Sequence, residues 1–509
     1  SMRTSSSAGI RFFAVLVTVA VCIATVGVPE PASAVDRTRG KKKRHTSAES
    51  RELWYVVKIM GSPVGFAKET EESTPDGVRR SQVMNLTMSR MGQKMTMFMS
   101  MESLDGLDGR LRSGKLAVQA SAMTVVSTAV LEGDTVRYKT ESAGFERTRS
   151  IPWEEGALGP ATADAHVIEQ LRAGEREFSY RSFEVEAGEF RTFRIVRIDA
   201  DPVEIDGRTQ SPIVIEDYEG DTDIPRSTIW LDENYTVYKT VIVQMGLEIL
   251  VERITPEEME QLELEPDFDI IRRSMIPCEG YPDDPSVLED VTMRLDFERM
   301  PSDVWDFNGP NQVVEKRGER YVDLLVSRET VNRMSISSAE KQDGTFLHAD
   351  SYIQSTDARI QAVADSVRRA VGGSDWEVAK ALAVWVNGHI TEKNLGQGFA
   401  SALEVLETRT GDCTEHSVLL TSLLRAAGIP ARPAVGLAYS NGQLVGHMWT
   451  EAHVEYWRTL DALDLDTLPI RIRLSAAQSD RAFDERDLVG AYDVVGGLRV
   501  KVLKYNPIE

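Results

Sequence analysis

The residues best suited to carry out a reaction lie in the stretch GDCTEHSVLLTSLLRAAGIPAR, residues 411–432. This stretch holds Cys413, one of three cysteines in a chain of 509 residues, and a histidine three positions later, His416. Asp412 and Glu415 have the spacing of a helix capping box, so we expect a helix to begin at Cys413. The cysteine is therefore predicted to lie in the first helical turn.

This predicted helix has a buried face and a clear end. Its apolar stripe consists of Leu419, Leu420, Leu423, Leu424 and Ala427, and Gly428 followed by Pro430 ends it. At a helix start the unpaired N–H groups and the helix dipole stabilise a thiolate, which lowers the pKa of a cysteine. The same N–H groups are candidates to hold the oxyanion that forms when a thiolate attacks a carbonyl. A nucleophilic Cys413 is the main hypothesis, and an inert buried thiol is the alternative.

A nucleophilic cysteine needs a base, and the next segment offers candidates. The segment PAVGLAYSNGQLVGHMWTEAHVEYW contains Asn441-Gly442, a strong hairpin signal, between two alternating runs. On its second predicted strand, one face carries His447, Trp449, Glu451 and His453. Asp461 follows on the next extended run and could orient the imidazole, as in a nucleophile–base–orienter triad.

Spacing alone leaves two alternatives to a Cys413–His447 pair. His416 lies one helical turn from Cys413 and is the rival base. Cys413, His416, His447 and His453 are also residue types that bind Zn(II). Their spacing matches neither CxxC nor HExxH, so we expect no metal at this site.

The segments GDCTEHSVLLTSLLRAAGIPARPAVGL, HMWTEAHV and WRTLDALD, in this order, resemble the core of the transglutaminase-like superfamily. The resemblance spans roughly residues 355–480 and implies a variant of the papain-like cysteine-hydrolase fold. It implies Cys413 as the nucleophile, His447 as the base and acid, and Asp461 as the orienting residue. Some animal relatives require calcium, but no EF-type or clustered acidic loop appears in this sequence, so we expect no cofactor.

Four further residues are expected to support that set: Trp449, Glu451, Asp412 and His416. Asp464 and Asp466 are near enough to Asp461 to be alternatives for the third position. The chain has Asp461-Ala462-Leu463 where members of this superfamily usually carry Asp-Pro-Thr.

The predicted reaction is attack of the Cys413 thiolate on an amide carbonyl, with His447 protonating the departing amine and an acyl-enzyme as the product. Water would then give a peptidase or amidase, and an amine would give a protein-glutamine acyltransferase. We favour hydrolysis because excluding water requires a shaped tunnel. The expected partner is a protein or peptide substrate. The alternative is a non-catalytic envelope binding protein whose β domain captures a lipid or a peptide, or an envelope protein with a structural role.

The rest of the chain must position these residues. Residues 353–509 change from helical periodicity to strands, which predicts an α+β domain of transglutaminase-like fold. Residues 51–254 alternate with period two, typical of an antiparallel β domain. An acidic linker near 255–269 and a small β-rich region at 270–352 are expected between them. The predicted fold class is thus multidomain, with antiparallel β-rich domains ahead of the α+β domain.

A methionine-rich stretch, MNLTMSRMGQKMTMFMSMES, stands out in the β domain. Strand alternation places Met95, Met97, Met99 and Met101 on one face, with Met84, Leu86 and Met88 on one face of the preceding strand. Three interpretations are open: a Cu(I) site of thioethers, an adaptable apolar groove for a lipid or peptide, and a sheet core filled by methionine.

Charge and the N-terminus limit the partners and the location. The net charge of −22 argues against binding to nucleic acid or to an anionic membrane surface. Arg3 and Arg11, the apolar run 12–28 and the sequence Ala32-Ser33-Ala34 predict a signal peptide over residues 1–34, followed by a disordered basic linker at 35–50. We therefore expect export to the periplasm or beyond. The alternative is a membrane anchor formed by the uncleaved run 12–28, which would be the only membrane contact.

Overall fold

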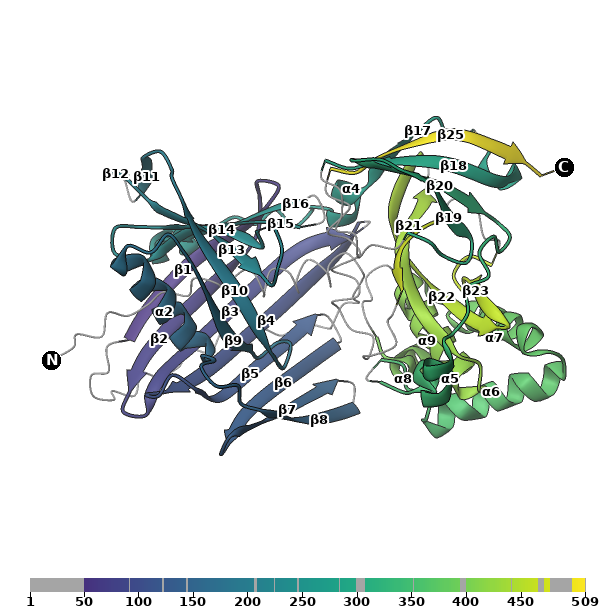
Figure 1. The fold of residues 1–509 in the computed structure, drawn as a ribbon, viewed down its shortest axis with the longest axis horizontal. Helices are drawn as coiled ribbons and strands as arrows, with labels where there is room; N and C mark the ends of the chain where they lie inside the picture. The colour runs from purple at the N-terminus through teal and green to yellow at the C-terminus, as the bar shows by residue number, and fades with distance from the viewer. Residues whose placement is uncertain are drawn as a thin grey trace.

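Two β-sheets, one in each half of the chain, organise the structure (Figure 1). The structure is a computed structural model that describes residues 50–90, 92–120, 123–142, 145–205, 208–223, 225–244, 247–282, 284–298, 307–350, 352–393, 400–440, 442–465, 471–476 and 497–508. The predicted leader, the predicted linker up to residue 49, Asn441 and Asp466 lie outside the described residues. Within the described residues, none of the helices is both long and apolar enough to cross a membrane.

The first sheet has 14 strands in the order β8-β7-β6-β5-β4-β3-β2-β1-β16-β15-β14-β13-β10-β9, and its neighbours pair in the antiparallel sense. This confirms the expected antiparallel β-rich domain. The strands are β1 (Ser50–Ile59), β2 (Ser62–Thr74), β3 (Gly77–Arg90), β4 (Gln93–Gly106), β5 (Leu111–Ala120), β6 (Met123–Glu132), β7 (Thr135–Ser142), β8 (Phe145–Pro152), β9 (Glu177–Glu184), β10 (Glu189–Ile198), β13 (Ile213–Glu219), β14 (Ser227–Leu231), β15 (Val237–Gln244) and β16 (Leu247–Ile254); β11 (Val203–Ile205) and β12 (Arg208–Gln210) form a separate hairpin.

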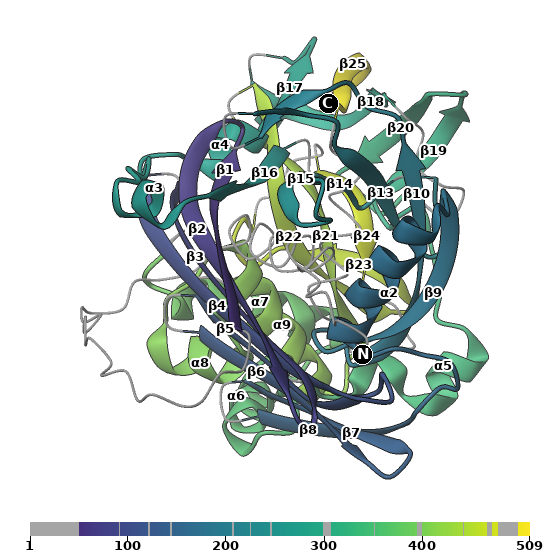
Figure 2. The same ribbon diagram turned by 90° about the vertical axis from the view of Figure 1, so that its left-hand side faces the viewer.

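The first sheet curves around a helix, α2 (Pro160–Ala173), which lies on its concave side (Figure 2). The helix contacts β9 at one end of the strand order and β3 and β4 near its middle, and a flat sheet could not bring these strands to one helix. Asp105 at the end of β4 accepts a hydrogen bond from the first-turn N–H of Thr162 at 2.8 Å and so fixes the start of the helix. The sheet and helix together enclose one apolar core.

The methionine-rich stretch forms the hairpin partners β3 and β4. In this register Met84 lies opposite Met99 and Met88 lies opposite Met95. The side chains of Met84, Met88, Met95, Met97 and Met99 are all at most 1% exposed. Of the three interpretations, this burial favours methionine as the filler of a sheet core.

The second sheet has nine strands, in the order β19-β20-β18-β25-β17-β22-β21-β24, with β23 paired to β22. Strands from residues 270–352 and from residues 353–509 share it, because β17 pairs with both β22 and β25. The predicted domain boundaries stay predictions, but backbone hydrogen bonds join these two parts. The strands are β17 (Ile276–Glu279), β18 (Leu288–Asp296), β19 (Gln312–Arg317), β20 (Tyr321–Ser327), β21 (Ala431–Ser440), β22 (Gln443–Val454), β23 (Tyr456–Leu460), β24 (Arg471–Ala476) and β25 (Arg499–Pro507).

One buried side chain joins the two edge strands of the second sheet. Gln312 on β19 donates its amide N–H to the carbonyl of Arg473 on β24 at 3.1 Å, and the Arg473 N–H donates to the amide oxygen of Gln312 at 2.9 Å. These two bonds replace the backbone pairing that the edge strands lack. They hold β19 next to β24.

Helices cover the second sheet on the side of β22. In the structure they are α5 (Ser338–Asp343), α6 (Ala358–Val371), α7 (Asp375–His389), α8 (Ala402–Thr408) and α9 (Cys413–Ala426), with η2 (Thr345–Leu347) between α5 and α6. Helix α3 (Pro256–Glu260) lies in the predicted linker, and α4 (Ile270–Ser274) and η1 (Pro285–Val287) lie in the predicted small β-rich region. Helix α9 contacts α6, α7 and α8 as well as β21 and β22. The predicted α+β fold of this half is confirmed.

Helix α9 begins at Cys413 as expected, but the prediction that it buries a single apolar face was wrong. Every residue from Thr414 to Leu424 is buried, because helices pack on one side of α9 and the sheet packs on the other. The polar residues of α9 therefore need partners inside the protein.

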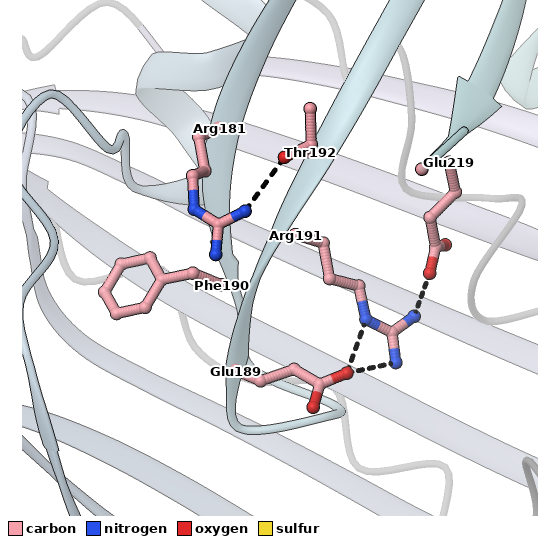
Figure 3. Close-up of a pocket in the computed structure, with 7 residues that line it drawn as sticks. Arg181, Glu189, Phe190, Arg191, Thr192 and Glu219 are labelled. Carbon is pink, nitrogen blue, oxygen red and sulfur yellow. Dashed lines mark hydrogen bonds and ion pairs between the residues drawn. The ribbon is translucent and has the colours of Figure 1, made fainter.

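One surface cavity lies in the first sheet, away from α9. It has a volume of about 470 Å³ and is lined by residues of β9, β10 and β13. Figure 3 shows that its two arginines already have partners: Arg191 pairs with Glu189 at 2.9 Å and with Glu219 at 2.6 Å, and Arg181 donates a hydrogen bond to the Thr192 hydroxyl at 2.8 Å. This cavity offers no reactive group.

Candidate active site

The start of α9 is capped as the sequence predicts. The Asp412 carboxylate accepts the backbone N–H of Thr414 at 2.8 Å and also that of Glu415, and the Glu415 carboxylate accepts the Asp412 N–H at 3.0 Å. The other oxygen of Glu415 accepts the N–H of Ala400 at 3.1 Å. Burial, and then the charge of Asp412, raise the pKa of Glu415. The half-buried Cys413 follows this cap directly.

This cap corrects one expectation about the oxyanion. The N–H groups of Thr414 and Glu415 are occupied by the Asp412 carboxylate, and the His416 N–H donates to the Asp412 carbonyl at 3.0 Å. These three first-turn donors were candidates for holding an oxyanion, and the structure assigns them to the cap instead.

Polar side chains attach α9 to β22. The Ser417 hydroxyl donates to the carbonyl of Trp449 at 2.7 Å, and the Thr450 hydroxyl lies 3.2 Å from that of Ser417 and 3.3 Å from that of Thr421. Cys413, Ser417 and Thr421 are spaced by four, so they share one helix face, which is turned toward β22.

The two elements also run in the same direction, since Pro430, just after α9, accepts the N–H of His453 near the end of β22 at 2.8 Å. The start of α9 therefore lies toward the start of β22, on the side of His447. This places Cys413 and His447 at the same end of the α9–β22 contact.

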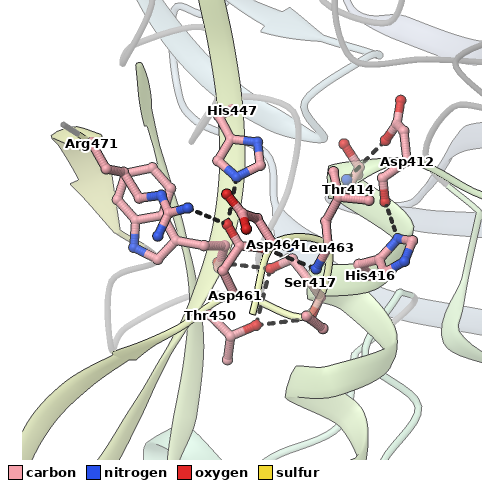
Figure 4. Close-up of polar contacts among 12 residues, drawn as sticks. Asp412, Thr414, His416, Ser417, His447, Thr450, Asp461, Leu463, Asp464 and Arg471 are labelled. Atoms are coloured by element: carbon pink, nitrogen blue, oxygen red, sulfur yellow. Dashed lines mark hydrogen bonds and ion pairs between the residues drawn. The ribbon is translucent and has the colours of Figure 1, made fainter. Parts of the chain in front are cut away.

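His447 and Asp461 form a hydrogen-bonded pair. Nε2 of His447 donates to Oδ2 of Asp461 at 2.6 Å, and both residues are buried (Figure 4). Because Nε2 holds the carboxylate, Nδ1 is the ring nitrogen left for proton exchange with another group. The two residues come from neighbouring strands, since β23, which ends at Leu460, pairs with β22.

The carboxylate of Asp461 is fully occupied. Oδ1 accepts the backbone N–H of Leu463 at 2.9 Å and of Asp464 at 3.2 Å, and Oδ2 also accepts Nη2 of Arg471 at 2.6 Å. Burial by itself raises the Asp461 pKa, but the positive charge of Arg471 and the charge and hydrogen bond of His447 outweigh it and hold the pKa well below its usual range. Asp461 is therefore an ionised partner of His447, and Asp464 takes part through its backbone.

The predicted supporting residues lie further along β22. Glu451, fully buried, forms ion pairs with Arg432 and Arg473, both at 2.8 Å. Burial opposes ionisation of Glu451, yet the two arginines lower its pKa. Trp449 is buried, and its ring centroid lies 6.0 Å from that of His447. Both side chains hold the strand on which His447 sits.

The rival histidines have other contacts. Nδ1 of His416 donates to the Asp412 carbonyl at 2.6 Å, and burial lowers the His416 pKa, which favours the neutral ring. The ring of His453 accepts the N–H of Ile336 at 3.4 Å. Among the described residues, no group of three or more His, Cys, Asp or Glu side chains has the geometry of a metal site.

Three contact residues of this site were not singled out from the sequence: Arg471, Ser417 and Thr450. Arg471 and Arg473 alternate with Ile472 and Leu474 in RIRL, and two arginines on one face of an apolar strand were a signal of a buried acidic partner. Ser417 and its helix neighbour Thr421 were a second signal, since they follow Cys413 at the four-residue spacing that marks one helix face.

The comparison with known families agrees with this geometry. Residues 361–462 match the model of the transglutaminase-like superfamily, and the match contains Cys413, His447 and Asp461. This region is a transglutaminase-like domain. The predicted resemblance is thereby confirmed. A search among curated proteins gave no match.

Two solved structures show weaker similarity to parts of the chain. One is a β-barrel-like protein of a domain of unknown function from Brucella abortus, with a TM-score of 0.32 and 12% identity over 41% of this chain and 96% of the other. The other is the periplasmic domain of TgpA from Pseudomonas aeruginosa, bound to ethylmercury, with a TM-score of 0.28 and 17% identity over 41% of this chain and 94% of the other. The assignment of the transglutaminase-like domain rests on the family match, since both TM-scores are low.

Proposed function

We propose that the transglutaminase-like domain is a cysteine amidase or peptidase that works through an acyl-enzyme on Cys413. The observation that carries this proposal is the hydrogen bond between His447 and the ionised Asp461, at the end of β22 that lies near the start of α9. A histidine oriented in this way through one ring nitrogen is the usual partner of a nucleophilic cysteine.

In the first half of the reaction, the thiolate of Cys413 adds to the carbonyl carbon of an amide. As the tetrahedral intermediate collapses, the C–N bond breaks and Nδ1–H of His447 gives its proton to the departing amine. A thioester on Cys413 and a neutral His447 remain. Asp461 stabilises the imidazolium before this step and holds Nε2 in place throughout.

In the second half, Nδ1 of His447 takes a proton from a water molecule as that water adds to the thioester. The Cys413 thiolate leaves, and the product is a carboxylic acid. An amine in place of water would give a new amide and a transferase. We propose hydrolysis, since water reaches the half-buried Cys413 unless a substrate tunnel excludes it. We further propose, from the sequence of residues 1–34, that the enzyme is exported and acts on proteins or peptides of the cell envelope.

A generic activated ester tests this proposal without knowledge of the substrate. Wild-type protein mixed with 4-nitrophenyl acetate is expected to release a burst of 4-nitrophenolate close to one equivalent, with the acetyl group on Cys413 in the mass spectrum. Cys413→Ala should show no burst. Absence of a burst in wild type, or an equal burst in Cys413→Ala, contradicts the proposal.

The same acyl-enzyme distinguishes hydrolysis from transfer. Added N-acetyl-lysine amide should leave the rate of acyl-enzyme decay unchanged if water is the acceptor, and should accelerate the decay and yield acetylated amine if the protein is a transferase. The second result would keep the acyl-enzyme but overturn hydrolysis.

A further inference from the structure

We infer that Arg471 is a positioning residue of this site, which acts on His447 through the carboxylate that both residues share. The inference rests on the proposed function and adds a fourth side chain, from β24, to the three that the sequence singled out. Nη2 of Arg471 and Nε2 of His447 both lie 2.6 Å from the same atom, Oδ2 of Asp461. Figure 4 shows the side chains of Arg471 and His447 approaching the carboxylate from different strands.

Arg471 determines both the charge and the orientation of that carboxylate. With Oδ1 already bonded to two backbone N–H groups, the carboxylate cannot rotate without losing the contacts of Arg471 and His447 together. Among the described residues, Arg471 is the one arginine or lysine that forms an ion pair with Asp461. Its charge keeps Asp461 ionised in a buried place and also offsets part of the negative charge that His447 experiences.

The position of Arg471 is itself built into the fold. Arg471 is 8% exposed, and its guanidinium lies over the ring of Trp449, 5.4 Å from the centroid. Of its nitrogens, Nε and Nη1 have no hydrogen-bond partner within the described part of the chain, and neither has Nε1 of Trp449. These atoms belong to residues that line a cavity of about 20 Å³ between β24 and β19, large enough for one water molecule.

The cavity links Arg471 to the strands ahead of the transglutaminase-like domain. Asn311 and Gln312, at the start of β19, line it from the opposite side. Because Gln312 also joins β19 to β24, the wall that confines Arg471 comes from residues 307–327. The small β-rich region therefore supports the position of a side chain next to His447.

The other charged and titratable groups near the pair come from several elements. They are Arg473 on β24, Glu451 on β22, Asp464 after β23, Asp412, Cys413 and His416 at the start of α9, and Lys393 after α7, whose charge acts on His416. Arg473 is equally buried and sits two residues from Arg471, but its carboxylate partner is Glu451. Arg473 is thus a matched control for Arg471.

The test is the pH dependence of Cys413 alkylation by iodoacetamide, in full-length protein with Cys22 and Cys278 replaced by serine. In Arg471→Met, loss of the positive charge should move the midpoint of the profile upward by about half a pH unit to one unit. Arg471→Lys, which keeps the charge, should have a midpoint close to that of wild type. Arg473→Met should also leave the midpoint near that of wild type. A folded Arg471→Met with the wild-type midpoint, or an equal shift in Arg473→Met, overturns the inference.

A second pair of variants tests whether Arg471 acts on His447 through Asp461. This pair also keeps the inference testable if Arg471→Met alone does not fold. Asp461→Asn and the double variant Asp461→Asn/Arg471→Met leave no buried carboxylate for Arg471 to act through. Their midpoints should coincide, and a further shift in the double variant contradicts the inference. If the wild-type profile itself is unaffected by His447→Ala, the proposed function fails. If it depends on His447 but not on Arg471, only the inference fails.

Discussion

Asp461 is the residue on which the candidate site depends. Its two oxygens accept four hydrogen bonds, from His447, Arg471 and the backbone of Leu463 and Asp464. The sequence motif favours Asp461 over its acidic neighbours, because Trp457 and Leu460 fix its place in the motif. Arg471 could not be paired with it from sequence, since the two residues meet through β24, and no pattern in the sequence indicates that this strand lies beside β21.

The depressed pKa of Asp461 predicts how stability depends on pH. A carboxylate whose pKa is lower in the folded than in the unfolded chain stabilises the fold above its unfolded pKa of about 3.9, and this contribution is lost as pH falls toward the folded value. Asp461→Asn also leaves Arg471 unpaired, so it should cost about 3 kcal/mol at pH 7.

The difference in unfolding free energy between wild type and Asp461→Asn should therefore shrink as the pH falls below about pH 4. Urea unfolding at a series of pH values measures it, with Asp365→Asn on the exposed side of α6 as the control for the loss of one negative charge. A difference that grows as the pH falls below about pH 4 would show that Asp461 is not stabilised as an anion.

At the scale of elements, the contact between α9 and β22 sets the distance between Cys413, at the start of α9, and His447 on β22. The capping box, the start at Cys413 and the end at Gly428 were all predictable, because capping and left-handed glycine are local properties. The burial of α9 on all sides was not, since it depends on α6, α7 and α8 packing on the side away from β22. Ser417, Thr421 and Thr450 are the polar residues that this burial requires to be paired.

Ser417→Ala tests that contact. Loss of the hydroxyl leaves the Trp449 carbonyl without its side-chain donor at a buried place, which should cost about 1–2 kcal/mol of unfolding free energy. Ser422→Ala is the matched control, because its equally buried hydroxyl bonds only to the Val418 carbonyl four residues back in the same helix, and its loss should cost about 0.5 kcal/mol or less. Equal costs in chemical denaturation would mean that the α9–β22 bond contributes nothing specific.

At the scale of the molecule, one curved antiparallel sheet precedes a second sheet that carries the transglutaminase-like domain. Period-two alternation was enough to predict the antiparallel strands, such as the pair β1 and β2. The order of the strands was not predictable, because β1 pairs with β16 and Gln312 meets Arg473 across long stretches of chain. Such pairs are selected by the packing of the whole sheet and leave no local signal.

The methionine core of the first sheet makes a prediction at this scale. Met99 is fully buried between β3 and β5, so Met99→Ala should cost about 2–5 kcal/mol, while Met99→Leu, of similar volume, should cost less than about 1.5 kcal/mol. Urea unfolding of both variants checks this. A Met99→Ala variant as stable as wild type would show that these methionines are not the core and would reopen the groove interpretation.

The central claim, that Cys413 is a nucleophile activated by His447, is tested most directly by the alkylation of Cys413 with iodoacetamide as a function of pH. Cys22 and Cys278 are replaced by serine, and the control is His453→Ala, a histidine on the same strand that contacts Ile336 instead. Wild type and the control should share a midpoint well below the free-thiol value of about 8.5, and His447→Ala should move it toward that value. A wild-type midpoint near about 8.5, or one that His447→Ala leaves unchanged, would contradict the account.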